Sequence, residues 1–494
     1  MGHGVACEAE VARMTFFRQR EFRLATLLTM AAAVVATLGF APGDAFASIL
    51  VLWMVGFYGW IIWKRYRRHP GELLDADMVF LFFFGIYLLL PFSLYTFLNF
   101  GLLELQVPTR ALVVGAASVL GVALGMNWPN TRPILALAPA WDRPWDTRLA
   151  RWICAGLFAI GVVLLAGLIA ILGVASFTET GYAETYAAEA GYGYLSIGIV
   201  FLQLGLFVTF LSEWNGETAK SPRIVWLMFI LYALVALRVG RRRMVLESGV
   251  GLLALRHFLV KKFDTRKIVA IVVLAAVIFT VVGQARSALQ GGLAAMTAFL
   301  RDDFTADQMR FVLAEPETVT LALTEIVDII PAQEDYRYGA TVWEAVVILV
   351  PSALYPSRPL APSQWFVWRY DPETARAGGG YSFALIAEGY MNFGYAGAFL
   401  MGFLEALFFR AITDYRRAVP NSKSRTLLYI VVMSYTVSFI RGDIATLLKA
   451  FFFAAGLPAL LIAFVLGSPS LRTWGKKFLA LPRPGSPLPA GSGD

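Results

Sequence analysis

The chain consists largely of apolar segments that are each long enough to cross a lipid bilayer. A transmembrane helix needs about 20 apolar residues, and on this criterion we predict about twelve spans. Many of the lysines and arginines lie in short loops between the spans. The predicted spans cover residues 24–41, 47–63, 77–98, 110–126, 151–173, 194–212, 222–238, 244–260, 267–283, 383–409, 426–440 and 444–466.

Composition supports a polytopic, all-α membrane protein. The 494 residues are 58% hydrophobic and only 15% charged, and a soluble domain cannot hide so much apolar surface. The net charge of +8 comes mainly from cations that flank apolar segments, so no nucleic-acid partner is expected. Cys7 and Cys154 lie far apart and the histidines form no cluster, so the sequence predicts no disulfide framework, no metal site and no cofactor.

The distribution of basic loops predicts the topology. Short loops rich in Lys and Arg stay in the cytoplasm, and their alternation places both termini there. The alternation requires residues 222–260 to form a hairpin of two spans. We therefore predict a cytoplasmic tail (1–23), nine helices (24–283), a large extracytoplasmic loop region (284–382), three helices (383–466) and a partly disordered cytoplasmic tail (467–494).

The turn of the predicted hairpin carries four arginines: Arg238, Arg241, Arg242 and Arg243. A cationic cluster on the extracytoplasmic side opposes the usual charge bias of membrane proteins. Guanidinium groups bind phosphate oxygens bidentately, so we interpret the turn as an anion site. The alternative is contact with lipid headgroups. Glu247 follows Arg243 at a spacing of i,i+4, and we expect it to be a structural counter-ion.

A second cluster opens the predicted span 383–409. Glycines at 378–380 precede it, and Glu388 lies in its first turns, with Asn392 and Tyr395 on the same helical face. A carboxylate at this shallow depth can accept a proton from a sugar hydroxyl, as general-base catalysis requires. The alternative is a buried glutamate that pairs with an arginine of a neighbouring helix.

Further candidates lie on the same predicted side. Arg441 and Asp443 stand between the last two spans, where they can pair with each other, bind phosphate and act as a base, or mark the turn. Prolines in the run 351–359 orient Arg358, and Arg286 follows the ninth span. Aromatic residues in this region can stack on sugars or lie at the membrane interface. They include Trp365, Tyr381 and Tyr390.

These motifs resemble those of the bacterial oligosaccharide repeat-unit polymerases, the Wzy-type O-antigen and exopolysaccharide polymerases. The resemblance rests on residues 238–243, 351–359, 381–394 and 439–443. It implies a GT-C-like glycosyltransferase of the bacterial inner membrane with its active site on the periplasmic side. Such an enzyme joins undecaprenyl-pyrophosphate-linked repeat units into a polysaccharide.

The resemblance also implies roles for the candidate residues. Glu388 is the first candidate for the catalytic base and Asp443 the second. Arginines replace a divalent ion at the pyrophosphate, so no metal or cofactor is expected. The implied partners are lipid-linked oligosaccharide substrates, with a chain-length regulator and a flippase of the same pathway. Predicted pyrophosphate-binding residues are Arg238, Arg241, Arg242, Arg243, Arg286, Arg358 and Arg441; predicted glycan-binding residues are Tyr381, Tyr390, Asn392 and Trp365.

Two alternatives remain at this stage. The related O-antigen ligases use a periplasmic histidine, whereas His257 is predicted to be cytoplasmic, which disfavours a ligase. A flippase or transporter tends to place ionisable residues near the membrane midplane, on broken helices in repeated halves. This chain places most of its unusual charges at one surface, which favours the polymerase.

Overall fold

The computed structural model describes residues 43–98, 107–173, 194–214, 222–238, 241–271, 314–350, 354–376 and 379–468. Every regular element within these residues is a helix, which confirms the all-α prediction. Seven of the described helices are long and apolar enough to cross a membrane, which indicates a multi-pass membrane protein. The full count of twelve stays a prediction, and predicted span 24–41 and most of 267–283 lie outside the described residues.

The seven candidate spans agree closely with the predicted segments. They comprise α2 (Gly43–Arg68), the continuous α3 (Ala76–Phe84), η1 (Gly85–Leu89) and α4 (Leu90–Leu98), α5 (Thr109–Met126), α7 (Thr147–Leu172), η2 (Leu195–Ile197) with α10 (Gly198–Glu213), α20 (Leu385–Ala418), and the continuous α23 (Ile444–Leu447), η3 (Leu448–Gly456) and α24 (Leu457–Gly467). Further helices are α6 (Arg132–Ala136), α11 (Arg223–Arg238), α12 (Arg242–Leu259), α21 (Lys423–Ser434) and α22 (Thr436–Ile440). The two helices α11 and α12 correspond to the predicted hairpin.

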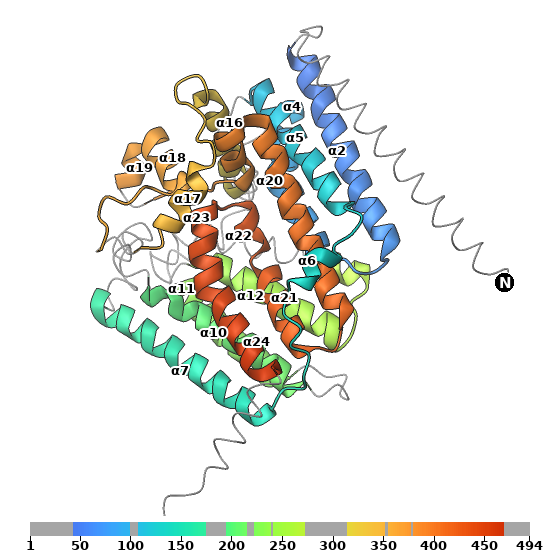
Figure 1. Cartoon of the computed structure of the whole chain (residues 1–494), viewed down its shortest axis with the longest axis vertical. Coiled ribbons are helices and arrows are strands. Elements are labelled where there is room, and N and C mark those ends of the chain that lie inside the picture. Colours follow the sequence, from blue (N-terminus) through green and yellow to red (C-terminus); the bar gives the residue numbers. More distant parts are fainter. Residues whose placement is uncertain are drawn as a thin grey trace, which may run out of the picture.

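The long helix α20 runs through the middle of the bundle. It has α2, α4 and α5 on one side, and α7, α10 and α11 on the other (Figure 1). Glycines allow α5 and α20 to approach closely, because a Cβ at Gly121 would lie 2.0 Å from the Phe399 carbonyl oxygen. Likewise, a Cβ at Gly402 would lie 2.4 Å from the Ser118 carbonyl oxygen. Small residues at such positions are the usual device for packing helices inside a membrane.

A buried ionic cluster lies at one end of the bundle, and we call that end of the bundle the basic end. Arg65 of α2 pairs with Asp77 at 2.5 Å and with Asp75 at 3.1 Å. Arg416 and Arg417 at the end of α20 also pair with Asp75. Buried charges are tolerated only where each has a well-placed partner, so this cluster joins α2, α3 and α20 specifically.

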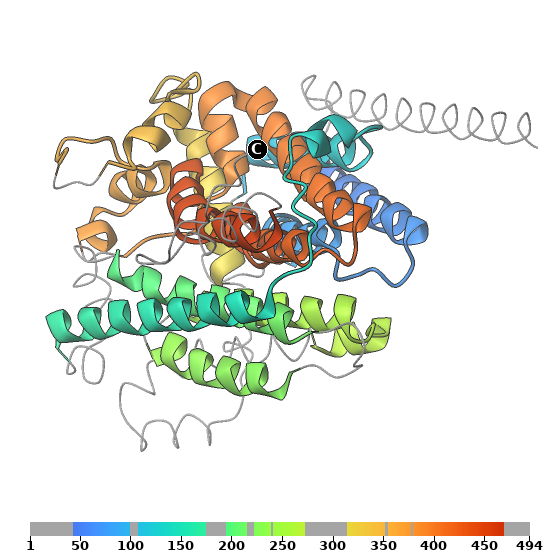
Figure 2. The ribbon, with the colours of Figure 1, turned by 60° about the horizontal axis from the view of Figure 1, so that its bottom comes forward.

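The helix α20 bends sharply near its start, which differs from the predicted continuous span. Gly394 has a φ of +61°, a left-handed conformation that suits glycine. The bend folds residues 385–392 back against the following turn, where a Cβ at Gly397 would lie 1.8 Å from the Gly389 carbonyl oxygen (Figure 2). Residues 385–392 therefore form a short half-helix packed inside the bundle, opposite the basic end.

The region predicted to lie outside the membrane contributes four described helices. They are α16 (Ala314–Ile329), α17 (Ala340–Val347), α18 (Pro362–Tyr370) and α19 (Pro372–Arg376). Apolar residues recur at helical spacing over 318–330 and predict an amphipathic helix there, and α16 agrees because it buries Val319, Leu323 and Ile326. Figure 1 shows α17, α18 and α19 gathered near α23, next to the half-helix end of the bundle. The predicted site residues Glu388, Arg441 and Asp443 lie there.

Candidate active site

Glu388 lies in the first turn of the half-helix and is fully buried, with 0% exposure. Its Oε2 accepts a hydrogen bond of 2.8 Å from the Ile444 N–H, which opens α23. Asn392 donates to the Glu388 carbonyl oxygen at 2.8 Å and to Thr341 Oγ1 at 2.7 Å. Glu388 thus stands where α20, α23 and α17 meet.

The two carboxylate oxygens of Glu388 differ in their hydrogen bonds. Oε1 is buried and accepts no hydrogen bond of good geometry from the described residues, although the Thr341 hydroxyl lies near the carboxyl group. The charged groups that act on Glu388 are Asp443 and Glu344, both acidic. Among the described residues no arginine forms an ion pair with Glu388.

Asp443 is also fully buried, but both of its oxygens are engaged. Oδ1 accepts a hydrogen bond of 2.6 Å from the Thr446 N–H and caps α23. Oδ2 accepts a hydrogen bond of 2.9 Å from the Ser363 N–H in the first turn of α18. A carboxylate that satisfies the N–H groups of two helix starts holds those helices together.

Arg441 and the arginine turn come together at this end of the bundle. Arg441 forms an ion pair with Glu315 of α16, and its carbonyl oxygen accepts a 3.4 Å hydrogen bond from the Phe383 N–H. Arg243 pairs with Glu247 at 3.4 Å, which confirms the predicted i,i+4 contact. Both Arg243 and, less strongly, Arg441 act electrostatically on Glu247.

The remaining predicted arginines have different surroundings. Arg241 is half-buried, and its N–H donates to the Ala236 carbonyl oxygen at 2.7 Å, closing the turn. Arg358 donates from Nη1 to the carbonyl oxygens of Ile348 and Val350, at 2.8 Å each, just beyond the end of α17. The side chains of Arg238 and Arg242, and the whole of Arg286, lie outside the described residues.

Two of the predicted glycan-binding residues are partly accessible. The Tyr381 hydroxyl donates to Asp371 at 2.8 Å, and hydrogen bonds from Thr374 hold the pKa of Asp371 below its usual value. Trp365 lies below the Arg337 guanidinium at 5.5 Å. Both residues are therefore placed by polar neighbours at the edge of the site.

The other two predicted glycan-binding residues are buried. Tyr390 donates to the Ile330 carbonyl oxygen at 3.2 Å, and Asn392 accepts a 2.8 Å bond from the Gly339 N–H. These bonds hold the loop between α16 and α17 against the bend of α20. The ring of Tyr338 in this loop is 73% exposed. The sequence analysis missed this residue, which lies two positions before α17.

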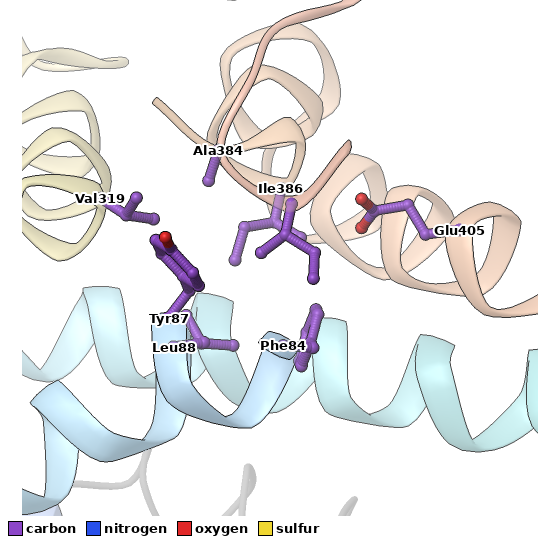
Figure 3. A pocket seen from close by; sticks show the side chains of 8 residues that line it. Phe84, Tyr87, Leu88, Val319, Ala384, Ile386 and Glu405 are labelled. Carbon is purple, nitrogen blue, oxygen red and sulfur yellow. The ribbon is translucent and has the colours of Figure 1, made fainter. Parts of the chain in front are cut away.

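A small cavity lies below the half-helix. Glu405 of α20 directs its carboxylate into this cavity (Figure 3) and is only 6% exposed. Its Oε1 has no hydrogen-bond partner among the described residues. The sequence analysis also missed this residue, because the bend that places it opposite Ile386 was not foreseen. The cavity is lined by Phe84, Tyr87, Leu88, Val319, Ala384, Ile386, Glu405 and Ile440.

A polytopic helical bundle that gathers arginines and a buried carboxylate at one end has the parts of a membrane-embedded transferase for an anionic substrate. The family model of the O-antigen polysaccharide polymerase Wzy matches residues 147–470, more than half of the chain. The chain therefore belongs to this family, which confirms the resemblance, and the protein is an inner-membrane enzyme that polymerises glycan repeat units. No curated protein and no solved structure matches the chain significantly.

Proposed function

We propose that the protein joins undecaprenyl-pyrophosphate-linked oligosaccharide repeat units into O-antigen or exopolysaccharide at the periplasmic face of the inner membrane. The observation that carries this proposal is the loop of residues 441–444. It carries Arg441, which forms an ion pair with Glu315, and it donates the Ile444 N–H to Glu388. A group for a leaving diphosphate and a group for an incoming hydroxyl thus belong to one short segment.

The proposed reaction exchanges one glycosidic bond for another. The oxygen of the acceptor hydroxyl attacks the anomeric carbon of the donor glycan, and the bond from that carbon to the pyrophosphate oxygen breaks. The hydroxyl proton passes to Glu388, and the electron pair leaves with the lipid-linked pyrophosphate. Arg243 and Arg441 stabilise the charge on the leaving group, which is usually the largest single contribution to catalysis.

The contacts of the two carboxylates support different roles for them. Glu388 has one oxygen engaged by Ile444, and its Oε1 is available to take a proton. Asp443 has both oxygens engaged by backbone N–H groups. We therefore propose Glu388 as the base and Asp443 as the residue that positions α23 and α18 around it. Arginines carry the pyrophosphate charge, and the reaction needs no divalent metal.

The proposed orientation places the basic end in the cytoplasm and Glu388 on the periplasmic side, in a GT-C-like bundle with both termini cytoplasmic. We expect a cysteine at Tyr338 (73% exposed, in the loop beside the bend) to react with an impermeant thiol reagent from outside spheroplasts. A cysteine at Leu137 (89% exposed, near the basic end) should react only after lysis. Cys7 and Cys154 are first replaced by serine. The reverse labelling pattern would overturn the orientation.

Polymerisation is tested with the purified protein and a defined lipid-linked repeat unit in the presence of a chelator. We expect a ladder of products that each differ by one repeat unit, because the donor and acceptor are both supplied by that substrate. Thermal unfolding of the same sample verifies that the protein is folded. Unextended substrate with folded protein would contradict the proposal. Transfer only to an added lipid A acceptor would instead indicate a ligase.

A further inference from the structure

Glu247 is a buried carboxylate that the proposed chemistry does not use. Its side chain is 0% exposed and lies one turn into α12. Oε1 accepts a 2.6 Å hydrogen bond from the Ser438 hydroxyl of α22 and also contacts Arg243 Nε at 3.4 Å. Ser438 and Glu247 are 191 residues apart in the sequence. This carboxylate therefore links the start of α12 to the end of α22.

The position of Ser438 connects Glu247 to Arg441. Ser438 lies in the last turn of α22 (Thr436–Ile440), and Arg441 follows directly as the C-cap residue of that helix. Fixing Ser438 to α12 therefore fixes the segment that carries Arg441. Arg243 is fixed to the same carboxylate through its Nε edge. Bidentate binding of phosphate uses the planar fork of the guanidinium, so its orientation decides whether it can bind.

The cost of burying Glu247 supports a role beyond helix stability. An exposed i,i+4 pair stabilises a helix only slightly. A charged side chain inside a membrane is costly to bury, and such residues commonly serve function. Arg243 and Arg441, whose charges both act on Glu247, offset this cost.

We propose that Glu247 is a positioning residue that holds Arg243 and Arg441 side by side as one diphosphate-binding pair, with Ser438 as its anchor on α22. This inference rests on the proposed function, because it names the residue that organises the same site. It makes Glu247 act through the arginines, without contact to the reacting atoms.

The test is a double-mutant cycle on binding of undecaprenyl pyrophosphate to the purified full chain in detergent. We expect Glu247→Gln to weaken binding at least tenfold and Ser438→Ala to weaken it by a smaller factor. Arg243→Ala should weaken binding strongly, and Arg243→Ala combined with Glu247→Gln should weaken it by less than the product of the two single factors, because only the part that acts through Arg441 remains. Undecaprenol, which lacks the diphosphate, serves as the control ligand, and its binding should be unchanged.

Glu405→Gln is the matched control variant, because it also neutralises a buried carboxylate but in the separate cavity below the half-helix. It should leave binding of undecaprenyl pyrophosphate unchanged. If the effects of Glu247→Gln and Arg243→Ala multiply, or if Glu247→Gln lowers only the thermal unfolding temperature, the positioning role is wrong. Because the readout is binding, a failure of this inference is distinguishable from a failure of polymerisation by the wild-type protein.

Discussion

Glu388→Gln is expected to lower the polymerisation rate at least ~100-fold, because positioned general bases typically contribute about 10²–10⁴-fold. Glutamine is nearly isosteric, and its side-chain oxygen can still accept the Ile444 N–H that Oε2 accepts at 2.8 Å. The junction of α20, α23 and α17 should therefore persist, while the proton acceptor is lost. Initial rates with a defined lipid-linked repeat unit, and binding of the same substrate, measure the two quantities separately. Binding should change little.

Asp443→Asn is the comparison that separates the two carboxylates. Asparagine retains one oxygen for the Thr446 N–H, but its amide nitrogen then faces the Ser363 N–H. We expect this variant to lower the thermal unfolding temperature, since an unsatisfied buried donor costs about 1–3 kcal/mol. If Glu388→Gln polymerises at the wild-type rate while Asp443→Asn is folded and inactive, Asp443 is the base instead.

The local features of this protein were accessible from its sequence. Apolar length predicted the positions of the seven described candidate spans, because it reflects the thickness of the bilayer directly. The spacing of Arg243 and Glu247 predicted their contact, because residues four apart share one face of a helix. The helix α16 was visible in its apolar periodicity for the same reason. In each case the determining interaction lies within a few residues.

Features that depend on tertiary contacts were not accessible. The left-handed φ of Gly394 and the half-helix it creates depend on how residue 389 meets residue 397. The double capping by Asp443 requires α18, which is 80 residues away in the sequence. The contacts of Arg358 also depend on tertiary structure, since its Nη1 donates to two carbonyl oxygens beyond the end of α17.

Arg441→Ala is expected to lower the polymerisation rate about 10²–10³-fold, the typical loss when one donor to a developing negative charge is removed. Among the arginines of known position, Arg441 is the closest in sequence to the contact between Ile444 and Glu388, so it best links charge stabilisation with proton transfer. Arg441→Lys should retain part of the activity, because the charge remains but the bidentate fork is lost. Rates at saturating donor measure this effect apart from binding.

The partner of Arg441 requires its own control, because Arg441→Ala leaves the partly buried Glu315 without its ion-pair partner. In a Glu315→Gln background the substitution should cause the same loss of rate, which assigns the effect to the missing guanidinium. Arg358→Ala is the matched comparison at the same end of the bundle. It should reduce stability through the end of α17 and leave the rate per folded molecule largely intact. Equal losses of rate in Arg358→Ala and Arg441→Ala would mean that general positive charge, and not the pair of Arg243 and Arg441, serves the diphosphate.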